Sequence, residues 1–160
     1  HTSDALAYDI IDHLDKNGLK NIPIMASHSN VRDVCDNKRN LPDTLIQEII
    51  NRKGLIGINF FRPFIGDNDA LDICHHVDKI LSLGGDDSIC FGTDFFYEGT
   101  HSLSIPMKYS NYGFLSVYEN SGKYQRILNH LKINIGMSHD IIKKMANENI
   151  IKFLDKILVE

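Results

Sequence analysis

The stretch PIMASHSNVRDVCDNKRNLPDTLIQEIINRKGLIGINFF, residues 23–61, decides the fold because it holds two strands with a helix between them. The apolar runs at residues 22–26 and 54–61 are short and bounded by turn residues, which is typical of strands covered on both faces. Pro42 marks the start of the helix, where its missing N–H costs nothing. The polar segment 28–41 predicts a long loop. Strand, helix and strand in this order predict a parallel βαβ unit.

The alternation of helices and strands continues on both sides of this unit. Upstream, apolar residues at helical spacing predict a helix over residues 4–14, with Thr2 or Ser3 as the N-cap and Gly18 as the stop. The downstream elements are expected to be a loop around Pro63 and Gly66, a helix at 69–83 with Leu71, Ile73, Val77, Ile80 and Leu81 inward, a buried strand at 88–92, and helices around 114–131 and 140–159.

Two α/β folds fit this order, a doubly wound parallel sheet and a TIM barrel. A complete (β/α)₈ barrel takes about 250 residues, so a chain of 160 residues would supply only the later part of one. We expect residues 1–160 to form part of a single domain. The abrupt start at His1-Thr2-Ser3 indicates a chain that has been cut.

Composition narrows the class of protein. The net charge is −4, and the 17 basic and 21 acidic residues are interspersed, which argues against a nucleic-acid partner. No apolar run approaches the roughly 18 residues of a membrane span, and the layout of a signal peptide is absent. We expect a soluble protein, with the cytoplasm as the favoured compartment. Cys35, Cys74 and Cys90 form no C-x-x-C pair, so we expect reduced, structural thiols.

Polar residues follow the predicted strands at positions suited to a metal site. His28 and Asp94 lie at carboxyl ends of strands, where the loops of parallel α/β folds meet at one rim. His1 would join them if a strand precedes it. Imidazoles and carboxylates are ligands that zinc prefers. The alternatives are a hydrogen-bonded structural role for His28, a turn or N-cap role for Asp94, and a terminal remnant for His1.

One arginine and two further histidines need separate interpretation. Arg39, in the loop after His28, has the planar donor fork that suits a substrate carboxylate or an oxyanion, although a solvated loop charge is the alternative. His75 and His76 lie in a helix at a spacing that gives no pair facing one ligand, which predicts a surface or a satisfied core role.

The sequence resembles the renal (membrane) dipeptidase family of the amidohydrolase superfamily over nearly its whole length. Residues 23–64 are the most specific part: Ser-His-Ser at 27–29, Arg-Asn-Leu-Pro-Asp at 39–43 and Asn-Phe at 59–60 are similar to that family's strand six, following loop and strand seven. HHVDKILSLGGDDSICFGTDF (75–95) resembles the helix and strand eight, and KKMANENIIKFL (143–154) resembles the last helix.

The resemblance implies the C-terminal portion of a TIM (β/α)₈ barrel, from the end of strand five onward, with a role for four residues. His1 and His28 would bind metal at the ends of strands five and six. Arg39 would contact the substrate's carboxylate and stabilise the tetrahedral intermediate. Asp94 would engage the substrate's amine and handle the proton passed to the leaving group.

The implied activity is zinc-dependent dipeptide hydrolysis, in which two zinc ions hold a bridging hydroxide that attacks the peptide carbonyl. The remaining ligands would come from an N-terminal half that this chain lacks, and a homodimer is a further expectation of the resemblance. One departure leaves substrate selection open: the family commonly has Phe-Asp-Gly after its strand-eight aspartate, whereas Asp94 is followed by FFYEG at 95–99. The alternatives are another amidohydrolase-type activity, such as a lactonase or deaminase, and a non-catalytic homologue or fragment with an interaction role.

Overall fold

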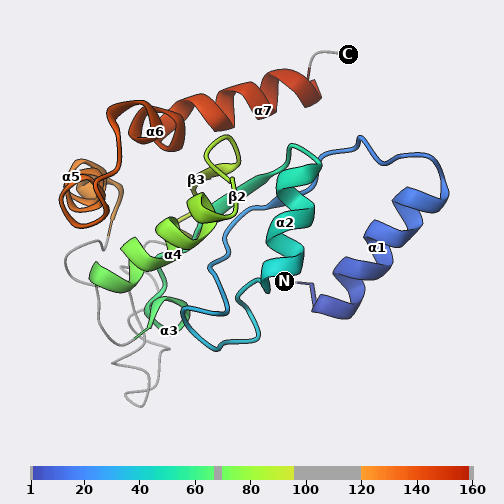
Figure 1. Ribbon diagram of the computed structural model, residues 1–160, viewed down its shortest axis with the longest axis horizontal. Coiled ribbons are helices and arrows are strands. Elements are labelled where there is room, and N and C mark those ends of the chain that lie inside the picture. The colour runs from blue at the N-terminus through green and yellow to red at the C-terminus, as the bar shows by residue number, and fades with distance from the viewer. Residues whose placement is uncertain (1, 67–69, 96–119, 159–160) are drawn as a thin grey trace, which may run out of the picture.

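The computed structural model describes residues 2–66, 70–95 and 120–158, and within them a three-stranded parallel sheet forms the centre (Figure 1). The strands are β1 (Met25–Ala26), β2 (Leu55–Ile58) and β3 (Ile89–Phe91), in the spatial order β1-β2-β3. In the register, Met25 pairs with Leu55, and Ile56 pairs with Ile89. All three predicted strands are confirmed, although each is shorter than its apolar run. Because the strands are parallel, their carboxyl ends lie at the same end of the sheet.

Strand β2 is buried on both faces, as its continuous apolar sequence predicts. Alternate residues of a strand point to opposite sides. Ile56 and Ile58 join the main core, to which helices α2 (Asp43–Asn51) and α4 (Ala70–Ser82) contribute apolar side chains. Leu55 lies in a smaller cluster with Cys90 and with Phe153 of helix α7 (Asn149–Leu158). Figure 1 shows α7 on one side of the strands and α2 and α4 on the other.

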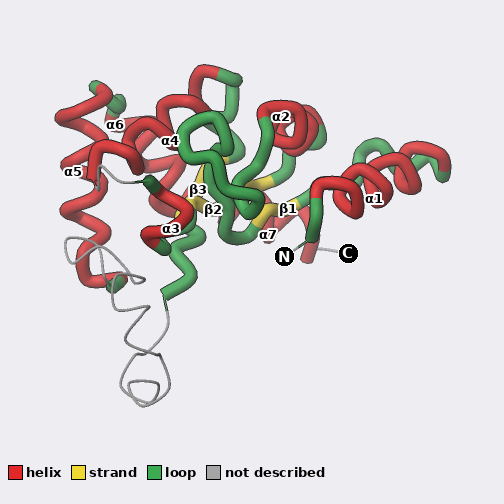
Figure 2. Tube along the Cα trace, turned by 90° about the horizontal axis from the view of Figure 1, so that it is seen from below, coloured by secondary structure: helices red, strands yellow, loops and turns green. Residues whose placement is uncertain are grey.

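Helix α1 (Asp4–Lys16) begins as predicted, since Ser3 caps it by accepting a hydrogen bond from the Leu6 N–H at 3.2 Å. Its apolar stripe, however, is not buried: no residue of α1 is, and Leu6 and Ile10 are 48% and 43% exposed. Figures 1 and 2 show the helix standing away from the sheet. Polar contacts hold it there, among them the ion pair between Arg52 and Asp15. Among the described residues, the neighbouring elements cover this stripe only in part, since Ala7, Ile11 and Leu14 are half-buried.

Three other expectations need correction. Residues 62–65 form a short helix, α3 (Arg62–Ile65), where a loop was expected, because Pro63 suits the first turn of a helix. Leu71, expected inward, is 48% exposed at the start of α4. The last predicted helix is divided into α6 (His139–Lys143), a π-helical turn (Lys144–Glu148) and α7.

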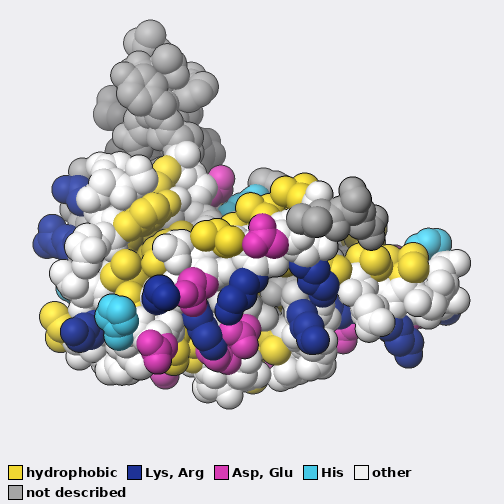
Figure 3. Space-filling view, turned by 90° about the horizontal axis from the view of Figure 1, so that it is seen from above, with side chains coloured by type: hydrophobic (Ala, Val, Ile, Leu, Met, Phe, Trp, Pro, Cys, Tyr) yellow, Lys and Arg dark blue, Asp and Glu magenta, His cyan; other side chains and the backbone are white. Residues whose placement is uncertain are grey.

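The remaining helical elements are a 3₁₀ turn (Ser121–Lys123) and α5 (Tyr124–Ile135), which covers the later part of the helix predicted at 114–131. The earlier part of that prediction lies outside the described residues. None of the described helices is both long enough and apolar enough to cross a membrane. On the face shown in Figure 3, basic and acidic side chains are interspersed and do not gather in a basic patch.

Candidate active site

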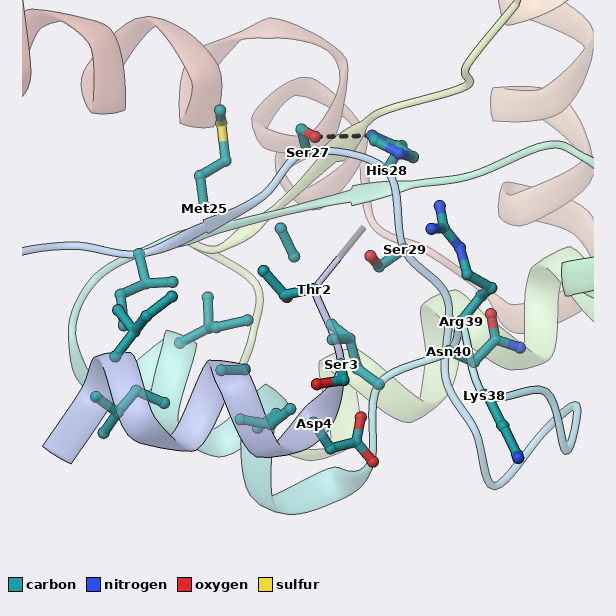
Figure 4. Close-up of a pocket in the computed structure, with 18 residues that line it drawn as sticks. Thr2, Ser3, Asp4, Met25, Ser27, His28, Ser29, Lys38, Arg39 and Asn40 are labelled. Atoms are coloured by element: carbon teal, nitrogen blue, oxygen red, sulfur yellow. Dashed lines mark hydrogen bonds between the residues drawn. The ribbon is translucent and has the colours of Figure 1, made fainter.

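A cavity of about 260 Å³ runs alongside β1, from Ile24 just before the strand to Ser29 beyond its carboxyl end. One wall is polar and includes Ser27, His28, Ser29, Arg39 and Asn40. The other walls are mainly apolar side chains of α1, β1 and α2. Figure 4 shows His28 and Arg39 on the same stretch of this polar wall, with the Arg39 side chain extending to the His28 side of its loop. The fold therefore brings together two of the four residues predicted from the sequence.

His28 is held at the end of β1 by its neighbours along the sheet. It is half-buried, and its Nδ1 lies 2.7 Å from the hydroxyl of Ser27 (Figure 4). The carbonyl oxygen of Ser27 packs where a side chain at Gly57 or Gly92 would otherwise lie. Two glycines on adjacent strands thus let β1 approach closely and place the imidazole. Both glycines stand in the predicted strand runs, but the sequence alone gave no sign of this contact.

Arg39 lies in the loop between β1 and α2, and its guanidinium stands over the ring of Phe64, 5.5 Å from the centroid. Its backbone N–H donates to the side chain of Asn37 at 3.0 Å. Arg32 organises the same loop, because its guanidinium donates to the carbonyl of Asn40 and to both carboxylate oxygens of Asp4. This pairing lowers the pKa of Asp4.

Asp94 follows β3, at the end of the sheet where the parallel strands finish, and its side chain is exposed. Its backbone is left-handed, with φ of 60°, a conformation that aspartate tolerates better than most residues. Its carboxylate accepts a hydrogen bond of 3.4 Å from the side-chain amide of Asn59, which directly follows β2. Asp94 is not among the residues that line the cavity. Of residues 95–99, which depart from the resembled pattern, all but Phe95 lie outside the described residues.

Of the two histidines predicted to bind metal, only His28 is among the described residues. His1 lies outside them, although its neighbour Thr2 lines the cavity. Among residues 2–66, 70–95 and 120–158, no group of three or more His, Cys, Asp or Glu could hold a metal ion. His28 fits the role of a single ligand, because it lies at a strand end and lines the cavity, and a hydrogen bond that orients one ring nitrogen is the usual companion of a metal-binding histidine. The convergence of His1 and His28 stays a prediction.

The predictions for His75, for His76 and for the cysteines are confirmed. The side chain of His75 is 60% exposed, whereas His76 is fully buried and hydrogen-bonded. The three cysteines are free thiols, and burial raises the pKa of Cys90 to about 12.

Sequence reasoning missed three buried asparagines near the site. Asn30, Asn40 and Asn59 are at most 1% exposed. Asn59 carried a readable signal, since it is the one amide inside the apolar run GLIGINFF. The other two stand in a polar loop, where nothing in the sequence separates a buried amide from a solvated one.

Comparison with known proteins supplies a family. The model of the membrane dipeptidase family, peptidase family M19, matches residues 1–158. A curated relative from Klebsiella pneumoniae, described as an uncharacterized protein in the 5′ region of pqqA, is 31% identical over 80 residues, which are 46% of this chain and 30% of the relative.

Solved structures with the same fold include three that span most of this chain. An amidohydrolase from Pseudomonas aeruginosa has a TM-score of 0.70 at 20% identity and covers 86% of this chain and 46% of its own. Dipeptidase AC, a metallopeptidase of family M19, has a TM-score of 0.67 at 20% identity, and the match covers 88% of this chain and 38% of the dipeptidase. A metallopeptidase from Rhodobacter sphaeroides, liganded with a phosphinate mimic of the dipeptide L-Ala-D-Ala, has a TM-score of 0.65 at 23% identity. That match covers 83% of this chain and 36% of the metallopeptidase. The chain thus spans less than half the length of these proteins.

Proposed function

Since the chain belongs to the membrane dipeptidase family, peptidase family M19, we propose that the protein containing it is a metal-dependent dipeptidase and that residues 1–160 form the C-terminal portion of its TIM barrel. The observation that carries the proposal is that His28, just past the carboxyl end of the parallel strand β1, lines one cavity with Arg39. TIM-barrel enzymes place their active sites at the carboxyl ends of their strands.

The exposed surfaces support a barrel that continues beyond β1. In the described sheet β1 and β3 each have only β2 as a neighbour, and unpaired strand edges are a liability for a folded protein. Met25 of β1 is 49% exposed, and the apolar stripe of α1 faces the cavity with Ile10 and Ile11. A further strand beside β1 would pair with its free edge and cover these side chains. The N-terminal half of the barrel would supply that strand.

His28 and His1 are the residues of this chain that would hold zinc, with further ligands from the N-terminal half. Zinc, when bound, supplies Lewis acidity that activates water near neutral pH and polarises a carbonyl. The chain's part in metal binding is to fix the imidazole of His28, through Ser27, at the rim of the cavity.

Two other residues would act on the substrate. Arg39 would bind the free carboxylate of the dipeptide and offset the negative charge that develops on the carbonyl oxygen. Phe64, beneath its guanidinium, limits the directions in which that side chain can point. The carboxylate of Asp94, held by Asn59, would bind the free amine of the substrate, and it would pass to the departing amine the proton that the attacking water gives up. One residue for each free end of a dipeptide fits this substrate class.

The test is hydrolysis of a panel of dipeptides by the complete protein, before and after treatment with a chelator. The panel should include L-Ala-D-Ala, N-acetylated and C-amidated dipeptides, a tripeptide and a simple lactone. We expect cleavage of dipeptides with both ends free, loss of activity with the chelator and recovery with added zinc. Chelator-resistant cleavage, or cleavage of the lactone alone, would overturn the proposal.

A further inference from the structure

Three buried asparagines connect the loops that carry Arg39 and Asp94. Asn30 lies two residues after His28, Asn40 follows Arg39, and Asn59 follows β2. A buried amide is costly unless its donors and acceptor are satisfied, so its hydrogen bonds fix the groups around it.

One half of this connection leads from Asn30 to Asp94. The side-chain oxygen of Asn30 accepts from the backbone N–H of Asn59 at 3.0 Å, and its side-chain nitrogen donates to the Asn59 carbonyl at 3.0 Å. Asn30 therefore binds both backbone groups of Asn59, as a neighbouring strand would. The side chain of Asn59 in turn accepts from the N–H of Phe61 at 2.6 Å and donates to Asp94.

The other half leads from Asn30 to Arg39. The carbonyl oxygen of Phe64 accepts from the side-chain nitrogens of Asn30, at 3.1 Å, and Asn40, at 2.9 Å. The ring of the same Phe64 lies under the guanidinium of Arg39. Phe64 thus contacts the Arg39 segment twice, through the Asn40 side chain and through the guanidinium of Arg39, and Asn30 is bonded to both halves.

We propose that Asn30, Asn40 and Asn59 are positioning residues that fix Arg39 relative to Asp94. The roles of Arg39 and Asp94 rest on the proposed function, whereas the hydrogen bonds do not. A displacement of about 1 Å between reacting groups can cost roughly a hundredfold in rate. The rate gained by rigid placement of two groups that hold opposite ends of one small substrate therefore offsets the cost of burying three amides.

The test compares two matched variants of the complete protein, Asn30→Asp and Asn149→Asp. Asn149 is equally buried at 2% exposure, and its side-chain nitrogen also donates to two backbone carbonyls, of Asp86 at 2.9 Å and Ile89 at 2.8 Å. It lies by the start of β3, at the opposite end of the sheet from the site. Each substitution removes a side-chain amide nitrogen that donates two hydrogen bonds, so both should lower stability by similar amounts. Phe64→Leu is a milder third variant, because it removes the ring and keeps the carbonyl.

Nuclear magnetic resonance and kinetics give separate readouts. We expect Asn30→Asp to shift both the Arg39 side-chain nitrogen and the Asp94 carboxyl carbon signals, and to lower kcat/KM by about tenfold to a hundredfold. Asn149→Asp should do neither, and Phe64→Leu should shift Arg39 alone. Unchanged Arg39 and Asp94 signals in Asn30→Asp would overturn the proposal, as would unchanged Arg39 signals in Phe64→Leu if Asn30→Asp does not fold. If Asn30→Asp shifts both the Arg39 and the Asp94 signals but the protein has no dipeptidase activity, the positioning role is supported and the proposed function is refuted.

Discussion

The Nδ1 atom of His76 accepts a hydrogen bond of 3.1 Å from the backbone N–H of Val31, which fastens helix α4 to the loop that carries Arg39. The other ring nitrogen donates to the carbonyl of Ile65 at 2.8 Å. Because a backbone N–H can only donate, the ring must be neutral at Nδ1 for both bonds to exist. Burial lowers the pKa of His76 from 6.5 to about 4, against smaller opposing effects from Ile65 and Asp72.

Stability should therefore fall in mild acid. Between pH 6.5 and 4 the unfolded chain protonates this histidine and the folded chain does not, so the contribution of His76 is complete above pH 6.5 and is lost as pH falls toward 4. Linkage puts that loss at about 3 kcal/mol. Denaturant unfolding at several pH values measures it. His76→Gln should flatten the slope in this interval, while His75→Gln, at an exposed position, should keep it.

Substitution of His28 by Ala should lower the metal content of the complete protein, because the variant lacks one of the proposed zinc ligands. We expect close to two zinc ions per chain in the wild type and clearly fewer in the variant, measured by atomic emission after dialysis. His75→Ala is the matched control and should bind as much zinc as the wild type. Equal zinc in His28→Ala and wild type would rule out the ligand assignment.

Arg39→Met should depress kcat/KM for dipeptides by roughly a hundredfold to a thousandfold, or about 3 to 4 kcal/mol of barrier, as the removal of one oxyanion donor does elsewhere. Methionine retains much of the apolar stem, so folding should survive. Arg126→Met, on the exposed side of α5, should leave the rate within a factor of about two. Steady-state kinetics on one dipeptide is sufficient, and a rate near wild type in Arg39→Met would refute its role.

Gly57→Ala should destabilise the protein and disturb the site together. The new Cβ would meet the carbonyl oxygen of Ser27 and lie 2.8 Å from the Cα of Gly92. Neither neighbour is a flexible side-chain end, so we expect a loss of about 1 to 3 kcal/mol of unfolding free energy, measured by denaturant titration. Zinc affinity should fall as well, because Ser27 precedes His28. Gly122→Ala meets only the side-chain oxygen of Asn120, at 3.0 Å, and should cost less than about 1 kcal/mol.

Local patterns in the sequence were sufficient for the three strands, for α2 and α4, and for the positions of His28, Arg39 and Asp94 beside them. Apolar periodicity, turn residues and helix caps such as Ser3 act between near neighbours in the chain, so they can be read from it directly. They also show which residues follow a strand.

Only the tertiary structure decided which of these side chains are covered and what they bond. The same apolar spacing gives three buried residues in α2 and none in α1, because burial depends on the elements that pack against a helix. Asn30, Asn59 and His76 are polar residues that each have a hydrogen-bond partner between 11 and 45 positions away. Their burial and their hydrogen bonds depend on how strands and loops pack in space, and the local sequence pattern does not show that packing.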